Sequence, residues 1–565
     1  MKKGFAFLIL SLVLIITLLG CSTATTTTNT ATATATITQS TTSTVTQSTT
    51  NTVTATATTT ATATATVTAT ASTAAQTPQY GGKLIYVRNT GIAVLGAPQD
   101  MPSFNWYNPM ISPVLEPLII MDARGNPAPW LAKSVDIAAD GKTITFHLNP
   151  GIKFQDGTAF DAAAVKYNFD AVVKANVAGS DVFKSVASYD ILDPLTLRLN
   201  LNQYDARLLP ALASSTLGQM ASPTALAKPA TPDTAAKLHL VGTGPFTFDS
   251  WQRDQYIKYT KWPGYWQTGK PYVDAIEFRN NADVPTSLLS LKAGEVNWVE
   301  NVDPSDYIAM QKQGYTGFIA SDLFFIFSIF MDSANPDSPF SKLQVRQAVE
   351  YAIDRAGMAQ GIGQGTMYPI YQHAVAKDPW YVQGQPQLKY DPVKAKQLLA
   401  AAGYPNGFTT PLTSDVRVRK DQLTAVQSYL DAVGIHTTLD MADVPRFTGL
   451  TQNGWKGMLL PGFPNMDTFT GWLGLYNSPI FTYPSMTWPS GWKQGMAAII
   501  SEPDLNKRMA LMQSWQKQLY DQSLIVTYIG DSPRSMTDGT VMDAGFYKNG
   551  IGGYWEPANV WLKKK

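Results

Sequence analysis

The sequence predicts an α/β fold, with helices covering a mixed sheet, for the part of the chain that follows residue 77. Apolar and polar residues alternate with the period of a strand at 143–148 and at 195–201. Apolar residues recur with the spacing of a one-sided helix at 345–353 and at 392–402. Helices followed by short strands in this way favour a sheet covered by helices.

Local signals in the first half of the body predict a hairpin and a helix. Residues 134–137 and 142–148 flank a turn that ends in Asp140-Gly141, which is typical of a β-hairpin. Asp161 can accept a backbone hydrogen bond at the start of a helix, so we expect a helix from Ala162 onward.

Two helices and a strand are predicted further along. Asp391 caps a helix with Pro392 in its first turn, and Gly403 ends it. A second helix at 421–433 leads directly into a strand at 435–439.

The composition excludes several classes of protein. The chain has 565 residues, 43 Lys and Arg against 42 Asp and Glu, and a net charge of +1, so it lacks the basic excess of a nucleic-acid-binding protein. Its length and its 44% hydrophobic content suffice for two to four domains. A single Cys excludes an intrachain disulfide and any CxxC metal or redox site.

The N-terminus predicts export and a lipid anchor. Lys2 and Lys3 precede an apolar run at 4–19, which is too short for a membrane-spanning helix and typical of a signal peptide at 1–20. The sequence Leu-Leu-Gly-Cys at 18–21 resembles the lipobox of bacterial lipoproteins, which implies a lipid on Cys21. The alternative is an uncleaved anchor in which the Cys has no role.

Residues 21–77 predict a disordered linker. From residue 22 the segment is rich in Thr alternating with Ala, and it contains no charged or aromatic residue. Neither face of such a strand offers enough apolar area to offset the entropy of ordering it. We therefore expect a tether that holds the body away from the membrane.

Short sequence blocks follow one another along the body. In chain order they are EPL at 116–118, PWLA at 129–132, DGKTITFHL at 140–148, GIKFQDGT at 151–158, GTGPF at 242–246, GYW at 264–266, LKAGEV at 291–296, VRQA at 345–348, AIDR at 352–355, YDP at 390–392 and AGYP at 402–405. Taken in this order, the blocks resemble family 5 extracellular solute-binding proteins, the oligopeptide, dipeptide and nickel receptors of ABC importers. Most of the blocks belong to turns, caps and helix faces, so they indicate the family more than the solute.

The resemblance implies a two-lobed fold like that of periplasmic binding proteins, of type II and of the large class with an extra inserted domain. The first lobe would comprise 78–116, 242–321 and 523–565, the inserted domain 117–241, and the second lobe 322–522. Ligand is enclosed when such lobes close about a hinge.

The same resemblance implies a receptor without catalysis or cofactor. It would capture an oligopeptide outside the cytoplasm and deliver it to the permease of an ABC importer, whose separate ATPase supplies the energy. The sequence agrees, because it contains neither a Gly-x-Ser-x-Gly elbow nor a His-Glu-x-x-His metal motif. A near match to a phosphate-binding loop at 264–271 has Pro271 where the magnesium-binding Ser or Thr is required.

Candidate ligand-binding residues are aromatic or charged. Each has an alternative role: packing for the aromatic residues, the solvated surface for the Arg residues and a helix cap for Asp467. The candidates are Trp106 and Tyr107 in the first lobe, Phe463, Trp472 and Trp488 in an aromatic, loop-rich segment of the second, Arg417 and Arg446 for an anionic end, and Asp467 for an amino terminus. Peptide receptors of the family have a Trp and an Asp where this chain has Leu459 and Gly462, which weakens a dipeptide assignment.

Other functions stay open. An oligosaccharide is the second solute class, because aromatic faces stack on sugar rings. Nickel is less favoured, since no His lies in the aromatic segment. A secreted hydrolase on a stalk or a surface adhesin would be a different class of protein, but the catalytic motifs and repeats that they require are missing from the sequence.

Overall fold

The structure is a computed structural model with two compact units, Met1–Thr77 and Pro78–Lys565. It describes residues 31–46, 52–67, 77–89, 91, 94–101, 107–121, 127–228, 239–319, 325–376, 378–416, 418–461, 465–466, 472–473, 482–543 and 555–564.

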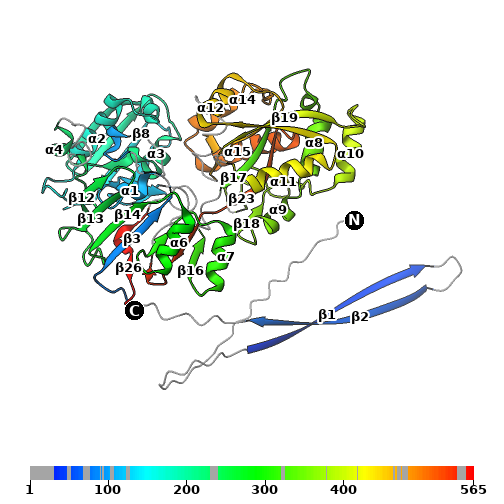
Figure 1. Cartoon of the computed structure of the whole chain (residues 1–565), viewed down its shortest axis with the longest axis horizontal. Coiled ribbons are helices and arrows are strands. Elements are labelled where there is room, and N and C mark those ends of the chain that lie inside the picture. The colour runs from blue at the N-terminus through cyan, green and yellow to red at the C-terminus, as the bar shows by residue number, and fades with distance from the viewer. Residues whose placement is uncertain are drawn as a thin grey trace. The chain divides into compact units, whose positions relative to one another are not determined.

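The first unit contains two strands, β1 (Ala31–Thr46) and β2 (Thr52–Val67), which pair antiparallel (Figure 1). The structure therefore differs from the disordered linker that we expected here. The reason is the period of two in the sequence, which suits an extended chain and places Thr opposite Thr at most of the Thr positions.

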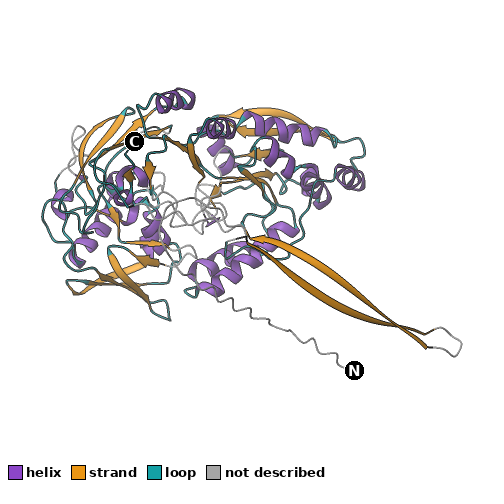
Figure 2. Cartoon of the chain, turned by 90° about the horizontal axis from the view of Figure 1, so that it is seen from below, coloured by secondary structure: helices purple, strands orange, loops and turns teal. Residues whose placement is uncertain are grey.

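The larger unit contains two seven-stranded sheets, and helices and strands are interspersed throughout it (Figure 2). In the first sheet, β3 runs parallel to both β14 and β15, whereas β24 runs antiparallel to its neighbours. The strand order is β12 (Phe246–Gln252), β13 (Tyr256–Lys261), β14 (Ala275–Asn280), β3 (Lys83–Arg88), β15 (Trp298–Val299), β24 (Arg534–Thr537) and β16 (Thr316–Ile319).

Helices and a small ribbon accompany this sheet. Helix α6 (Val284–Lys292) packs on β15, and α7 (Pro304–Lys312) packs on β24. Helix α1 (Asn108–Ile111) is entirely buried, and β25 (Val541–Met542) pairs with β26 (Trp561–Leu562). We call this sheet with its helices the first lobe.

A separate four-stranded antiparallel sheet forms the body of the inserted domain. Its order is β7 (Ala132–Ile137), β8 (Thr143–Leu148), β10 (Thr196–Leu201) and β9 (Val186–Asp193). The other elements of this domain are β4 (Glu116–Pro117) paired with β11 (Gln219–Met220), β5 (Ile119–Met121) paired with β6 (Pro127–Pro129), and the helices α2 (Ala162–Ala175), α3 (Leu208–Ser214) and α4 (Pro223–Leu226).

The second seven-stranded sheet forms the second lobe, at the yellow and orange end of the unit in Figure 1. Its order is β18 (Met367–Pro369), β23 (Ile525–Asp531), β17 (Phe325–Met331), β21 (Met458–Leu460), β19 (Phe408–Asp415) and β20 (Ile435–Ala442), and β22 (Asn465–Met466) pairs with β17. Its helices are α8 (Leu343–Ala352), α9 (Arg355–Gly361), α10 (Pro392–Ala401), α11 (Lys420–Asp431), α12 (Val444–Asn453), α14 (Trp492–Ser501) and α15 (Leu505–Asp521).

The secondary structure predicted from local signals is confirmed. Strands β7 and β8 form the expected hairpin, and the carboxylate of Asp161 accepts the backbone N–H of Ala164 at the start of α2. Asp391 caps α10 in the same way. One border differs, because β23 belongs to the second sheet and the chain returns to the first sheet between Asp531 and Arg534, not at 523.

Candidate functional site

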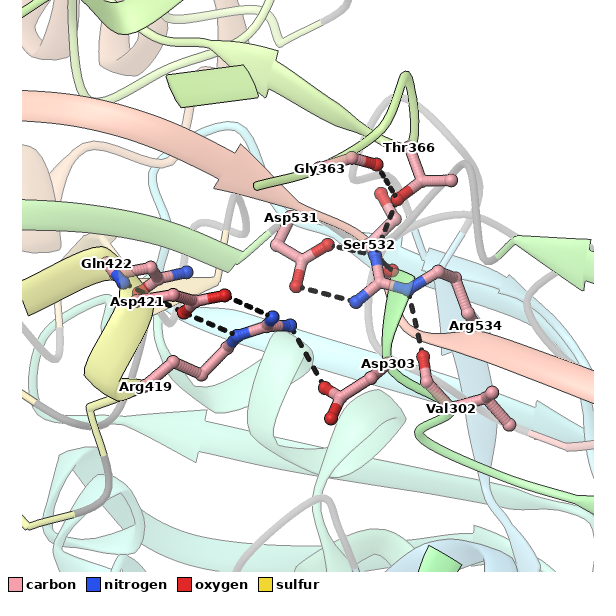
Figure 3. A network of polar contacts seen from close by, with 10 residues as sticks. All are labelled: Val302, Asp303, Gly363, Thr366, Arg419, Asp421, Gln422, Asp531, Ser532 and Arg534. Carbon is pink, nitrogen blue, oxygen red and sulfur yellow. Dashed lines mark hydrogen bonds and ion pairs between the residues drawn. The ribbon is translucent and has the colours of Figure 1, made fainter. Parts of the chain in front are cut away.

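The site of interest is the region where the two lobes meet. The chain leaves the first sheet after β16 and returns to it between β23 and β24, so two passages join the lobes. Figure 3 shows a network of charged and polar groups beside the return passage.

Arg534 lies at the centre of this network and is 5% exposed. Its two terminal nitrogens bind the carboxylate of Asp531, and its Nε donates to the carbonyl of Val302 at 3.0 Å. Nη1 also donates to the carbonyl of Ser532 at 3.1 Å and to Oγ1 of Thr366 at 3.3 Å. The guanidinium at the start of β24 therefore binds Val302 in the first lobe and both Asp531 and Thr366 in the second lobe.

Arg419 makes a second connection between the lobes. From the start of α11 its Nε and Nη2 bind both carboxylate oxygens of Asp421, at 3.1 and 2.7 Å, and Nη1 donates to Oδ1 of Asp303 at 3.0 Å (Figure 3). Asp303 directly precedes α7 of the first lobe. Burial acts to lower the pKa of Arg419, but hydrogen bonding to Asp421 and the charges of Asp303 and Asp421 raise it overall.

Four tryptophan rings on α14, on α15 and on the residues that precede α14 contact one another. Trp472 is 1% exposed, and its indole N–H donates to Oε1 of Gln516 at 3.1 Å. Trp492 contacts Trp472, stacks on Trp488 with ring centres 4.8 Å apart, and meets Trp515 edge-on. Trp488 is half-buried, so it is the more exposed of the two predicted tryptophans that lie in the described part of the chain.

The remaining predicted residues are distributed over different places. Tyr107 is half-buried and packs against the core of the first lobe. Arg446 is exposed, and its guanidinium binds Asp440 within the second lobe. The other predicted residues, Cys21, Trp106, Arg417, Phe463 and Asp467, lie outside the described residues.

Glu116 is a buried carboxylate that the sequence analysis treated only as part of a motif. Each of its oxygens accepts one indole N–H and one hydroxyl. Oε1 accepts from Trp130 at 3.2 Å and from Tyr265 at 2.8 Å, and Oε2 accepts from Trp266 at 2.8 Å and from Thr243 at 2.7 Å. Burial raises the pKa of Glu116 to about 7, although the four donors act to lower it.

The donors of Glu116 come from motif blocks that the sequence already showed. Trp130 belongs to PWLA, Thr243 to GTGPF, and Tyr265 and Trp266 to GYW. Their common feature is an N–H or O–H group near a Gly or Pro turn, which is the signal that could have pointed to a shared acceptor. The cluster joins the inserted domain to the first lobe.

The inserted domain also touches the second lobe. The backbone N–H of Ala206 donates to the carbonyl of Ile500, at the end of α14, at 2.8 Å. The guanidinium of Arg508 lies over the ring of Tyr204, 5.9 Å from its centre. The inserted domain and the second lobe thus share one continuous apolar cluster.

A cavity of about 250 Å³ lies beside β18. Its lining residues are Tyr368, Pro369, Ile370, Tyr371, Gln372, Ala374, Val375, Ala376, Tyr381 and Gln387. Among the described residues, the side chains that line this cavity are uncharged.

In the described part of the chain, no three His, Cys, Asp or Glu side chains come together in a set that could hold a metal ion. None of its helices has the length and apolar character needed to cross a bilayer.

Comparison with known proteins identifies relatives in sequence. Residues 126–479 match the family described as bacterial extracellular solute-binding proteins, family 5 Middle. The glutathione-binding protein GsiB of Shigella flexneri is 34% identical over 369 residues, which is 64% of this chain and 70% of that protein.

Comparison of structures identifies the same kind of fold. NikA from Brucella suis, in complex with Fe(III)-EDTA, matches with a TM-score of 0.73 and 20% identity over 85% of this chain and 100% of its own. DppA from Helicobacter pylori, in complex with the peptide STSA, matches with a TM-score of 0.66 and 20% identity over 86% of this chain and 99% of its own. These likenesses confirm the two-lobed binding-protein fold.

Proposed function

Because the chain belongs to the bacterial extracellular solute-binding proteins of family 5, we propose that it is a receptor for a peptide-like solute of an ABC importer. It captures the solute between its two lobes outside the cytoplasm and delivers it to the permease, and a separate ATPase drives transport. The observation that carries the proposal is the pair of sheets joined by two passages, with Arg419 and Asp303 binding across them.

The solute class follows from the relatives and from the charges of the site. GsiB binds glutathione by name, and one matching structure holds a peptide. A zwitterionic peptide needs an anion partner and a cation partner, because an unpaired buried charge is very costly. We propose Asp467 and Arg417 for these roles in preference to Arg446, whose guanidinium Asp440 already engages.

The aromatic residues support a role in enclosing the solute. Trp488 is half-buried and stacks on Trp492, and an aromatic ring of this kind suits contact with an apolar side chain or a ring of the solute. We propose Trp106, Tyr107 and Phe463 for the same role. The uncharged, tyrosine-lined cavity beside β18 favours an oligosaccharide as the second candidate solute.

The N-terminal features make the receptor a lipoprotein in this proposal. A signal peptide at 1–20 directs export, a lipid on Cys21 anchors the mature chain, and residues 22–77 connect it to the body. No bond-making chemistry, metal or cofactor is part of the proposed cycle.

Calorimetry tests the solute class directly. The full chain carrying Cys21→Ser is titrated with glutathione, di- to pentapeptides and neutral oligosaccharides, and native mass spectrometry identifies any solute that copurifies with it. We expect saturable binding of at least one peptide in the panel. Binding of oligosaccharides alone would replace the solute class, and binding of no member of either class, with none copurifying, would contradict a receptor for these solutes.

A further inference from the structure

Asp303 occupies the N-cap position of α7, but its side chain does not cap this helix. It stands directly before Pro304, the first residue of α7, and its side chain accepts no backbone N–H of that helix. In the segments that the structure describes, six other aspartates at the same position each accept the backbone N–H three residues further on. They are Asp161, Asp283, Asp354, Asp391, Asp443 and Asp504.

The carboxylate of Asp303 is instead bound to Arg419 of the second lobe, at 3.0 Å (Figure 3). The side chain of Asp303 is 63% exposed and that of Arg419 is 30% exposed, so water reaches this bond. It can therefore break and form again without burying an unpaired charge.

Arg419 is held ready for this contact by its own lobe. Asp421 takes Nε and Nη2 of the guanidinium in a fork, which fixes its plane and leaves Nη1 pointing to Asp303. Because Asp421 lies in the same helix region as Arg419, this fork does not depend on the first lobe.

We propose that Asp303 is a two-position latch between the lobes. In the closed form its carboxylate binds Arg419. In the open form it accepts the backbone N–H of Asp306 and caps α7, as the six other aspartates do at their helices. This inference rests on the proposed receptor function, in which the lobes open and close around a solute.

Because Asp303 has a partner in each form, neither the closed form nor the open form is strongly favoured. An exposed ion pair changes an equilibrium by roughly 1.4- to 5-fold, and the helix cap recovers part of that on opening. The latch therefore favours closure without trapping the solute, which a receptor must release to its permease.

The test measures the lobe separation in the absence of any solute. Cys21 is the single Cys, so a Cys21→Ser chain with Leu289→Cys on α6 and Val393→Cys on α10 takes two spin labels, at sites 63% and 65% exposed. Double electron–electron resonance then gives the populations of short and long distances. Asp303→Asn keeps a side chain able to cap α7 but removes the charge that Arg419 binds.

We expect Asp303→Asn to lower the ratio of short to long distances by roughly 1.4- to 5-fold. We also expect 0.5 M NaCl to lower this ratio in the wild-type background and to leave it unchanged in the variant. Arg446→Gln is the matched control, since it breaks an exposed Arg–Asp pair inside one lobe, and the ratio should not change.

Equal distance distributions for wild type and Asp303→Asn would overturn the latch, and so would a wild-type chain with no short-distance population. Neither result bears on solute binding, which calorimetry measures separately. Conversely, a chain that binds no solute but shows the predicted shift would keep the latch and reject the receptor.

Discussion

At the scale of single residues, Glu116 connects the inserted domain to the first lobe without any cation among its hydrogen-bond partners. Its four donors are neutral, and each oxygen meets one indole N–H, which can donate but not accept. The surroundings therefore favour Glu over Gln at position 116. The NH2 group of a Gln side chain would face an indole N–H in either orientation, and an indole N–H cannot accept a hydrogen bond.

Glu116→Gln should destabilise the body by about 1–3 kcal/mol at pH 4, the cost of a buried donor without an acceptor. The loss should become smaller as the pH rises. The pKa of Glu116 is raised to about 7, so its stabilising contribution is complete below the unfolded value of 4.5 and is lost as the pH rises through 7. Urea unfolding of both proteins between pH 4 and pH 8 measures this difference.

The control for this prediction is Glu295→Gln, which removes a carboxyl from the exposed surface. Its difference from wild type should be small at every pH. A Glu116→Gln loss that grows with pH would show that the carboxylate is favoured over the acid in the folded protein, contrary to the raised pKa.

Arg534→Met should lower the free energy of unfolding by about 3 kcal/mol, because it leaves the largely buried carboxylate of Asp531 without its partner. Adding Asp531→Asn to Arg534→Met should recover part of the loss, as measured in a double-mutant cycle. Arg446→Met is the surface comparison and should change stability little, since solvent screens its bond to Asp440. Equal losses in the two single variants would contradict the buried role of Arg534.

Local chemistry predicts some of these residues and not others. Asp161 and Asp391 are visible in the sequence as caps, because a cap depends on residues three positions apart. Glu116 is not, since its donors come from segments up to 150 residues away. Trp472 stays a predicted ligand-binding residue, and its described contacts with Gln516 and Trp492 also suit the packing role that the sequence left open.

At the scale of elements, the close approach of α14 and α15 depends on Gly495. A methyl group at this position would lie 2.1 Å from the ring of Trp515, so the two helices can meet only around a glycine. On α12, by contrast, a methyl group added at Gly449 would have no neighbouring atom within 4 Å.

Gly495→Ala should therefore destabilise the body by about 1–3 kcal/mol, the usual cost of overpacking. Gly449→Ala should stabilise it by about 0.5–1 kcal/mol, because alanine loses less backbone entropy in a helix. Thermal unfolding of the two variants and of wild type shows whether each substitution lowers or raises the stability. A neutral Gly495→Ala would mean that Trp515 is free to move aside.

Periodicity predicts elements better than it predicts borders. The hairpin of β7 and β8 and the helices α8, α10 and α11 lie where the patterns indicated them. The predicted end of the second lobe at 522 precedes β23, because β23 follows α15 directly and only strand pairing shows which sheet it joins. The Thr- and Ala-rich segment has a period of two, which favours a strand. It has few large apolar residues to bury, which favours a disordered chain.

At the scale of the whole molecule, the motif blocks predict the family and the fold, and both predictions are confirmed. The blocks belong to turns, caps and the Glu116 cluster of this chain. The solute is less predictable, because these blocks shape the scaffold and do not by themselves name a binding group. Of the predicted binding residues in the described part of the chain, Trp488 and Tyr107 are half-buried, and Arg446 is engaged by Asp440.

In the proposed cycle this chain captures a solute by closing its two lobes. Small-angle X-ray scattering measures that closure on the Cys21→Ser chain, with and without a peptide that saturates it in calorimetry. We expect a smaller radius of gyration in the saturated sample and a shift of the pair-distance distribution to shorter distances. An unchanged radius of gyration at full saturation would contradict this closure.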